Sequence, residues 1–372
     1  MELSHDAAAF GIHFVTTIFE ESAYSWPEVN NIFLQRDAFT TDLLDFYRKI
    51  MLRRVTPSVL VRIDQAYVRD FQVACGPREV AALIYETYRV PDRVVAPPLE
   101  PLALVGCDEA RFSDPDVDHM LFTSSGSFNY GHWLVDDLPK IRAAIDRLAH
   151  GGRPIRLLLA SHGTVIDQVR MDTIQYMIDD DRLSIAFFDK TKVYAIRNLY
   201  LATPVTCHPL DKSVPAMRYL GQLGRQRERF ARPTHALGAR KLFVARPGAN
   251  TRSLLNVDAV WDVLRTQGFV LVDPGQMSFA EQVSAFAAAQ TIIGVMGAGM
   301  TNTVFCSPQA RISYLAPRGW IETFYLDLAA ACGHRYRVVY GALDDPDQPP
   351  YLSRFSISDD DLAMVLSDLG DA

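Results

Sequence analysis

From residue 240 onward the chain alternates short apolar runs with amphipathic segments, and this alternation limits the fold more than any other feature. Each apolar run is followed by a stretch whose apolar residues recur every three or four positions. Strands that alternate with helices predict a doubly wound parallel sheet, because parallel neighbours need a crossover between them. The expected strands are 241–246, 269–272, 291–296, 312–316 and 336–341, and the expected helices are 256–267, 278–289 and 322–331.

Two of these helices carry recognisable end signals. Gly268 follows the last periodic residue of the first helix, where glycine commonly ends a helix. Ser278, with Glu281 three residues later, has the form of a capping box and predicts the start of the second helix.

The preceding half is less regular but also mixed. Strands at 155–161, 183–188 and 193–203 and a helix at 165–178 predict a second α/β unit, whereas no arrangement follows for residues 1–100. A chain of 372 residues favours two domains. We therefore expect an N-terminal α/β domain over 1–215, a linker helix over 216–239, a second domain over 240–345, and a C-terminal segment over 346–372 that packs back on the N-terminal domain.

Composition and charge exclude several classes of function. The net charge of −7 gives no overall attraction to nucleic acid or to anionic lipid, so phosphate recognition has to come from a few placed arginines. The five cysteines are scattered, without zinc-ligand spacing. Neither a leader sequence nor an apolar stretch of about 18 residues is evident, and a cytoplasmic protein is expected.

The stretch GVMGAGMTNTVF, residues 294–305, places small residues where a strand turns into a helix. Its G-x-x-G-x-G spacing fits neither the dinucleotide fingerprint nor the P-loop, which disfavours a dehydrogenase or a P-loop ATPase. Two readings remain open. The glycines only let helix and sheet pack, or residues 297–302 present backbone N–H groups to an anion at a helix N-terminus.

Two arginines follow the first strand of the same unit. Arg246 stands at its carboxyl end and Arg252 in the loop behind it, and ligands bind beyond the carboxyl ends of strands in such sheets. Two guanidiniums beside a helix N-terminus make a clamp for a diphosphate. The alternative is that either arginine pairs with a surface carboxylate such as Asp258.

A helix from about Tyr130 would place His132 and Asp136, four residues apart, on one face. A His oriented by a carboxylate is a usable general base, whereas a plain structural His at a helix start is the competing reading. Pro139 is expected to kink or end this helix. The neighbouring Ser124, Ser125 and Ser127 suggest a hydrolase only weakly, since no nucleophile elbow is present.

The motif N-Y-G-H-W-L-x-D-x-L-P-K (129–140), the segment that holds Arg246, Arg252 and Asn256, and FAEQVSAFAAAQTIIGVMGAGMTN (279–302) together resemble the family 61 glycosyltransferases. The resemblance implies a GT-B-like α/β architecture, with two Rossmann-like domains that face each other across a cleft. It also implies an inverting transfer of a hexosyl or pentosyl group without an obligatory metal. Met296, Val257 and Tyr314 depart from the family pattern.

This resemblance assigns roles to the residues. His132 and Asp136 are the expected catalytic pair. The expected donor-binding residues are Arg246, Arg252, Asn256, Gly297, Ala298, Gly299, Met300, Thr301 and Asn302. No cofactor is expected. The partners are a nucleotide-sugar donor, with a UDP-sugar expected, and a glycan or lipid-linked acceptor of capsule or exopolysaccharide biosynthesis, with peripheral contact at the inner face of the membrane. A non-catalytic nucleotide-sugar or glycan-binding protein and a Ser/His hydrolase are the alternatives.

Overall fold

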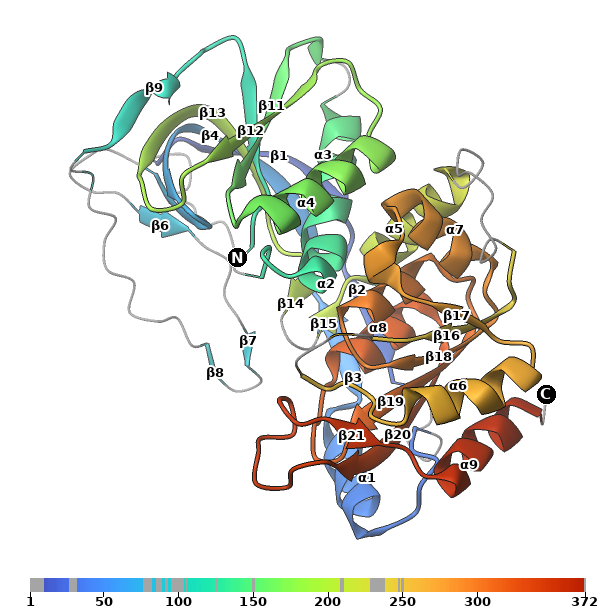
Figure 1. The fold of residues 1–372 in the computed structure, drawn as a ribbon. Helices are drawn as coiled ribbons and strands as arrows, with labels where there is room; N and C mark the ends of the chain where they lie inside the picture. Colours follow the sequence, from blue (N-terminus) through green and yellow to red (C-terminus); the bar gives the residue numbers. More distant parts are fainter. Residues whose placement is uncertain are drawn as a thin grey trace. The chain divides into compact units, whose positions relative to one another are not determined.

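The computed structural model describes residues 10–26, 32–75, 82–84, 89–90, 93–94, 104, 106–124, 126–148, 151–207, 211–227, 238–246, 248 and 251–370. The chain forms two compact units, which are considered separately below (Figure 1). The first unit holds Met1–Ser22 and Val55–Ala216, and the second holds Ala23–Arg54 and Met217–Ala372.

The second unit is built on the sheet that the alternation predicts. Its strands run in the order β17-β16-β18-β19-β20-β21, and all neighbouring pairs are parallel except β20 with β21. The parallel doubly wound pattern expected from residue 240 onward is therefore confirmed. The strands are β16 (Lys241–Val244), β17 (Val270–Val272), β18 (Thr291–Val295), β19 (Arg311–Pro317), β20 (Arg335–Leu343) and β21 (Phe355–Ser356).

The helices of this unit also begin and end near their predicted limits. The capping box is present, since the Ser278 hydroxyl accepts from the Glu281 N–H and the Glu281 carboxylate reaches back to the Ser278 N–H. Gly268 takes a left-handed conformation (φ 79°) just after the first helix. The helices are α5 (Val214–Arg227), α6 (Val257–Thr266), α7 (Phe279–Ala288), α8 (Phe324–Cys332) and α9 (Asp359–Gly370), with 3-10 segments at Pro274–Gln276 (η6) and Ala298–Phe305 (η7).

The C-terminal segment packs within the second unit, so the expectation that 346–372 returns to the N-terminal domain is wrong. Phe355, Leu362 and Val365 are buried in one core cluster with Phe243 and Ile293 of the parallel sheet. Burial of these apolar side chains against a sheet of their own unit stabilises the segment there. Of the expected linker helix over 216–239, α5 covers the first part, and 228–237 lie outside the described residues.

Residues 23–54 also belong to the second unit, although the expected N-terminal domain included them. They form β2 (Ser22–Ser25), α1 (Ala38–Ile50) and β3 (Leu52–Val55), with β2 paired to β3. The buried carboxylate of Asp327 on α8 explains this placement. Its Oδ1 accepts hydrogen bonds from Tyr24 (2.9 Å), Trp26 (2.7 Å) and Arg53 (3.3 Å). These bonds satisfy a carboxylate that is costly to bury alone.

The first unit holds a mixed sheet. Strands β12-β11-β10-β13 are parallel, and β13 then pairs antiparallel with β4, which continues to β5 and β6 and also pairs with β1. The expected Rossmann-like character therefore covers only the half built from β10 to β13. The strands are β1 (Ile12–Phe19), β4 (Ser58–Arg69), β5 (Gln72–Cys75), β6 (Ala82–Ile84), β9 (Asp108–Phe112), β10 (Asp118–Leu121), β11 (Ile155–Ala160), β12 (Leu183–Phe188) and β13 (Tyr194–Ala202).

Short hairpins and helices complete this unit. The hairpins pair β7 (Arg89–Val90) with β8 (Arg93–Val94) and β14 (Thr206–Cys207) with β15 (Asp211–Lys212). The helices are α2 (Tyr130–His132), α3 (Leu138–Arg147) and α4 (Thr164–Met177). The core of the sheet is apolar on both halves, with Val61, Ile63, Leu121, Leu158 and Leu199 among its buried side chains.

Candidate functional site

The first candidate site lies in the segment that follows β10. The Nδ1 atom of His132 lies 2.8 Å from the Oδ2 atom of Asp136, so the pairing predicted from their spacing is confirmed as a contact. The side chain of His132 is 19% exposed, whereas that of Asp136 is 8% exposed. The carboxylate thus orients an imidazole that is partly exposed.

The helix that carries this pair is irregular. It begins with α2, where the Asn129 side chain accepts from the Gly131 N–H, continues as a π-helical turn over Trp133–Asp137, and becomes α3. Pro139 was expected to kink or end this helix, and the helix does not end there. Pro139 stands in the first turn of α3, and the π-helical turn before it removes the regular bond that a proline disrupts. Single π-helical turns are frequent at functional sites.

Asp136 is held ionised by groups that the sequence did not reveal. Burial alone would raise the pKa of its carboxyl, but the charge of Lys212 and the hydrogen bonds from His132 and Thr206 outweigh burial and lower it far below the ordinary range. Thr206 and the fully buried Lys212 come from the β14–β15 hairpin, some seventy residues later in the chain. A buried lysine in a short strand gives no periodic signal.

Gly126 sets the position of the imidazole. A Cβ atom at this residue would lie 2.7 Å from Cγ and 2.8 Å from Cβ of His132, closer than side-chain atoms approach one another. The absence of a side chain at Gly126 is therefore required for the present position of His132.

The serines of this segment serve the adjacent carboxylate. The Ser127 hydroxyl donates to Asp137 Oδ2 at 2.5 Å, and the Ser124 hydroxyl lies 3.4 Å from the same atom. Asp137 is fully buried and forms an ion pair with Lys140 at 3.4 Å. Ser125 lies outside the described residues. This network gives Ser124 and Ser127 a structural role, and it does not support the hydrolase alternative.

The second candidate site lies in the second unit, where three glycines in and after β18 meet three different neighbours. A Cβ at Gly294 would lie 2.2 Å from the Sδ atom of Met300, one at Gly299 would lie 3.2 Å from Pro274, and one at Gly297 would lie 3.0 Å from Nη1 of Arg246. Gly294 and Gly299 thus allow neighbouring side chains to pack closely against the backbone of this turn. Gly297 gives space to a guanidinium.

Arg246 and Arg252 come close enough for their charges to interact. Burial, and then the charge of Arg252, lower the pKa of Arg246, and burial also lowers the pKa of Arg252. Within the described part of the chain, Nη1 of Arg246 and Nε of Arg252 are buried without a hydrogen-bond acceptor, and neither residue has a carboxylate within ion-pair distance. The pairing with Asp258 considered above is therefore not observed.

Arg252 is fixed by its backbone and by two neighbours. Its φ of 53° is in the left-handed region, which is uncommon for a residue with a side chain and is concentrated at functional sites. Nη1 donates to the carbonyl of Tyr351 at 3.0 Å, and the guanidinium lies 4.3 Å from the ring centroid of Trp320. The buried Tyr325, whose hydroxyl meets Thr301, faces both arginines. The sequence did not mark Trp320, Tyr325 or Tyr351.

The other residues predicted to bind the sugar donor have side chains that make contacts within the protein. The Asn256 amide exchanges two hydrogen bonds with the backbone of Ile357, at 2.7 and 3.2 Å, and so holds the C-terminal segment. Asn302 donates to Gln282 at 2.7 Å and to the Gly299 carbonyl at 3.1 Å. Met300 is buried beneath Gly294. Ala298 and Gly299 are half-buried at the start of η7 and offer only their backbone.

The departures from the family pattern are apolar positions of the second unit. Met296 and Tyr314 are buried, and Val257 packs against the core cluster that contains Val260. Burial raises the pKa of the Tyr314 hydroxyl well above its usual value.

Acidic residues gathered in the sequence at 114–118, 179–181 and 344–347 make local contacts. Asp118 pairs with Arg153, Asp180 with Arg182, and Asp344 with Arg354. Within the described ranges, no group of three or more His, Cys, Asp or Glu side chains is arranged to hold a metal ion. No helix in the described part of the chain has the length and apolar character needed to cross a bilayer.

Comparison with known proteins bears on both sites. Residues 130–313, which include His132, both arginines and the glycine turn, match the model of the family described as Glycosyltransferase 61. No curated protein matches the chain. Among solved structures, the iron-containing dodecameric glycosyltransferase TibC from enterotoxigenic E. coli is similar at 10% identity and a TM-score of 0.29, covering 72% of this chain and 79% of that one. The family match shows that the chain belongs to glycosyltransferase family 61.

Proposed function

We propose that the protein is an inverting glycosyltransferase that moves a sugar from a nucleotide-sugar donor to a glycan or lipid-linked acceptor in surface polysaccharide assembly. One observation carries the donor assignment. Arg246 and Arg252 are both partly buried, and their charges interact. Each has a guanidinium nitrogen that lacks an acceptor among the described residues. Gly297 has no side chain, which leaves room for the guanidinium of Arg246. Two cations held together in this way favour a dianionic group such as a diphosphate.

In the proposed reaction, an acceptor hydroxyl attacks the anomeric carbon of the donor, and the bond from that carbon to the diphosphate oxygen breaks. His132 takes the proton of the attacking hydroxyl, and Asp136 stabilises the imidazolium that forms. The negative charge that develops on the leaving nucleoside diphosphate is stabilised by the two arginines. A single displacement of this kind inverts the anomeric configuration.

The family adds three finer elements to this proposal. They are a GT-B arrangement of the two units, a UDP-sugar as donor, and transfer without a metal. A lipid-linked acceptor would bring the protein to the inner face of the membrane. The parallel sheet of the second unit and the parallel half of the mixed sheet in the first unit are compatible with a GT-B fold, which is built from Rossmann-like domains.

Calorimetry with UDP tests the donor site. We expect Arg246→Ala and Arg252→Ala each to weaken binding by about tenfold or more, because a charge-assisted hydrogen bond contributes about 1.5–3 kcal/mol. Arg265→Ala is the matched control, since Arg265 is exposed in the same unit and pairs with Asp262. Unchanged affinity in both test variants would exclude this diphosphate site.

Mass spectrometry of the protein incubated with a panel of nucleotide sugars tests catalysis. Hydrolysis of one donor, or transfer from it, is the expected result. Donor binding without turnover would instead identify a non-catalytic nucleotide-sugar-binding protein.

A further inference from the structure

Three parallel strands of the first unit end at one edge of the sheet. β10, β11 and β12 are successive parallel neighbours, so the segments that follow them emerge at the same edge. Phe128 follows β10, His162 follows β11, and Lys190 follows β12. Phe128 also stands four residues before His132 in the chain.

These three side chains form a continuous row, which we call the edge row. The rings of Phe128 and His162 meet edge to face, with centroids 6.3 Å apart. The Nδ1 atom of His162 lies 3.5 Å from the ammonium of Lys190. Phe128 is 61% exposed, which is unusual for an aromatic ring in a folded chain and leaves ring surface open to a ligand.

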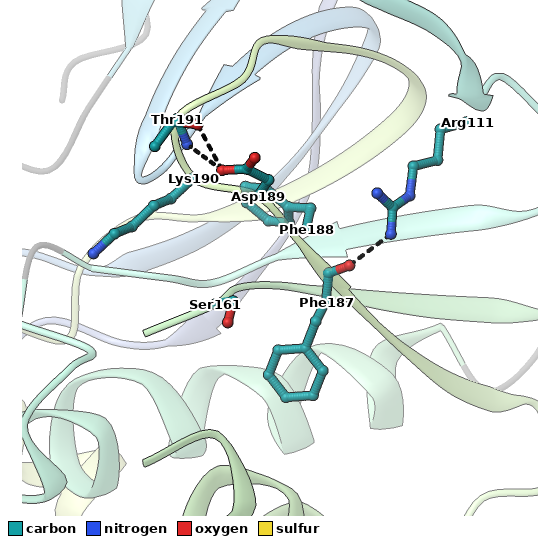
Figure 2. A pocket seen from close by; sticks show the side chains of 7 residues that line it. All are labelled: Arg111, Ser161, Phe187, Phe188, Asp189, Lys190 and Thr191. Atoms are coloured by element: carbon teal, nitrogen blue, oxygen red, sulfur yellow. Dashed lines mark hydrogen bonds between the residues drawn. The ribbon is translucent and has the colours of Figure 1, made fainter. Parts of the chain in front are cut away.

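A pocket of about 440 Å³ adjoins the row at Lys190. Figure 2 shows the residues that line it, which are Arg111 on β9 and residues at the ends of β11 and β12. This volume is within the range of small-molecule sites, about 300 to 1,000 Å³. The Arg111 guanidinium donates to the Phe187 carbonyl, and the Asp189 carboxylate accepts from the N–H and hydroxyl of Thr191 (Figure 2).

The charges around the pocket are balanced. The lining holds two cations, Arg111 and Lys190, and one carboxylate, Asp189. The carboxylate of Asp70 interacts with the charge of Lys190 and offsets the second cation. The nearby Asp167 pairs with the buried Arg170. Burial, and then the charges of Arg170 and Lys190, lower the pKa of His162 to about 4, so its imidazole is neutral at neutral pH. In the described residues the Nε2 atom of this ring has no hydrogen-bond partner. Aromatic surface, neutral hydrogen-bonding groups and no excess charge suit an uncharged ligand rich in hydroxyl groups.

Arg170 connects the pocket to the helix of His132. Its guanidinium lies 5.0 Å from the ring centroid of Trp133, the residue after His132, and 5.8 Å from that of Phe187. It is fully buried and also donates to the Ala160 carbonyl. Arg170 therefore links the wall of the pocket to the helix of His132 through the interior of this unit.

We propose that the edge row and its pocket bind a neutral sugar residue of the acceptor, next to the residue whose hydroxyl is presented to His132. The sugar ring lies on Phe128, and its hydroxyl groups bond to His162, Lys190 and Asp189. This inference rests on the proposed function, because it needs an acceptor glycan.

Saturation-transfer NMR with a panel of disaccharides built from glucose, galactose, mannose and N-acetylglucosamine tests the site. At least one disaccharide is expected to bind the full-length protein, and Phe128→Ala and Lys190→Ala are each expected to weaken that binding by about tenfold. Phe14→Ala is the matched control for the ring, because Phe14 is 58% exposed in the same unit. Lys192→Ala is the control for the charge, since Lys192 is exposed two residues further on.

The inference is overturned if no disaccharide binds the wild type, if neither edge-row variant weakens binding, or if inorganic phosphate binds there in place of the sugars. UDP calorimetry on the same preparations keeps the two proposals apart. Sugar binding without UDP binding would contradict the donor site but not the proposed sugar site at the edge row. UDP binding without sugar binding would contradict only the sugar site.

Discussion

Gly126 and His132 are in contact across a turn in such a way that a single added carbon would separate them. A Cβ at Gly126 would lie 2.7 Å from the Cγ atom of His132. The backbone at Gly126 is not left-handed, so an alanine there meets only this clash. The imidazole, and with it the contact to Asp136, has to move when the carbon is added.

We therefore expect Gly126→Ala to lower turnover toward the level of His132→Ala while UDP affinity is retained. Gly151→Ala is the control, since a Cβ at that exposed glycine of the same unit would meet nothing within 4 Å. Normal turnover in Gly126→Ala would show that the position of His132 is unimportant for the reaction.

His132→Ala should lower turnover by about 10²- to 10⁴-fold, the usual contribution of a general base, with nucleotide affinity nearly unchanged. Asp136→Asn should give a milder defect, because the base remains but its orientation and charge stabilisation are weakened. Turnover and melting temperature are measured on the same preparations. A His132→Ala protein that is less stable but has normal turnover would assign this residue a structural role instead.

Gly297→Ala tests the donor loop without removing a charge. The backbone at Gly297 is extended (φ 179°), which alanine tolerates, but the new Cβ would lie 3.0 Å from Nη1 and 3.3 Å from Cδ of Arg246. The guanidinium should be displaced, and UDP binding should weaken while the melting temperature changes little. Equal UDP affinity in the variant and the wild type would place the diphosphate elsewhere.

Activity should survive EDTA, because in the proposed donor site two arginines offset the charge of the diphosphate. The assay compares initial rates before and after exhaustive chelation. Loss of activity with EDTA and its recovery with manganese would show that a metal ion takes part.

Stability should fall as the pH drops from about 6.5 to about 4, and His334 should account for part of this loss. Burial lowers the pKa of His334 to about 4, whereas an unfolded His has a pKa near ~6.5. Between these values the unfolded chain binds a proton that the folded chain excludes, which costs at most about 1.4 kcal/mol per pH unit. The stabilisation is complete above pH 6.5.

Denaturant melts of wild type and His334→Leu at pH 7 and pH 5 measure this contribution. Because burial also lowers the pKa of His162 to about 4, only the difference between the two proteins reports on His334. The same pH dependence in both would show that His334 takes up its proton equally in the folded and unfolded chains.

Local patterns were sufficient to predict the parallel sheet of the second unit. Its strands are short apolar runs that need no distant information, and Ser278, Glu281 and Gly268 mark helix ends through neighbours only a few residues away. The His132–Asp136 contact was predictable for the same reason, since both residues lie within one helical turn.

The features that escaped prediction depend on contacts between distant parts of the chain. Lys212 and Thr206 act on Asp136 from a hairpin that has no periodic signal, and Asn256 binds Ile357 about a hundred residues away. The sequence shows that these residues are charged or can form hydrogen bonds, but it does not show which distant residues they contact.

The bond between Trp26 and Asp327 spans 301 residues of chain and has a consequence for synthesis. A ribosome that adds about 5–20 residues per second needs roughly 15 to 60 s to deliver Asp327 after Trp26 has been made. During that interval the apolar surface of Trp26 and of the neighbouring helix α1 has no sheet to cover it. The first unit is completed in the meantime, so the nascent chain carries a finished domain next to an unsatisfied segment, which is the state that chaperones recognise.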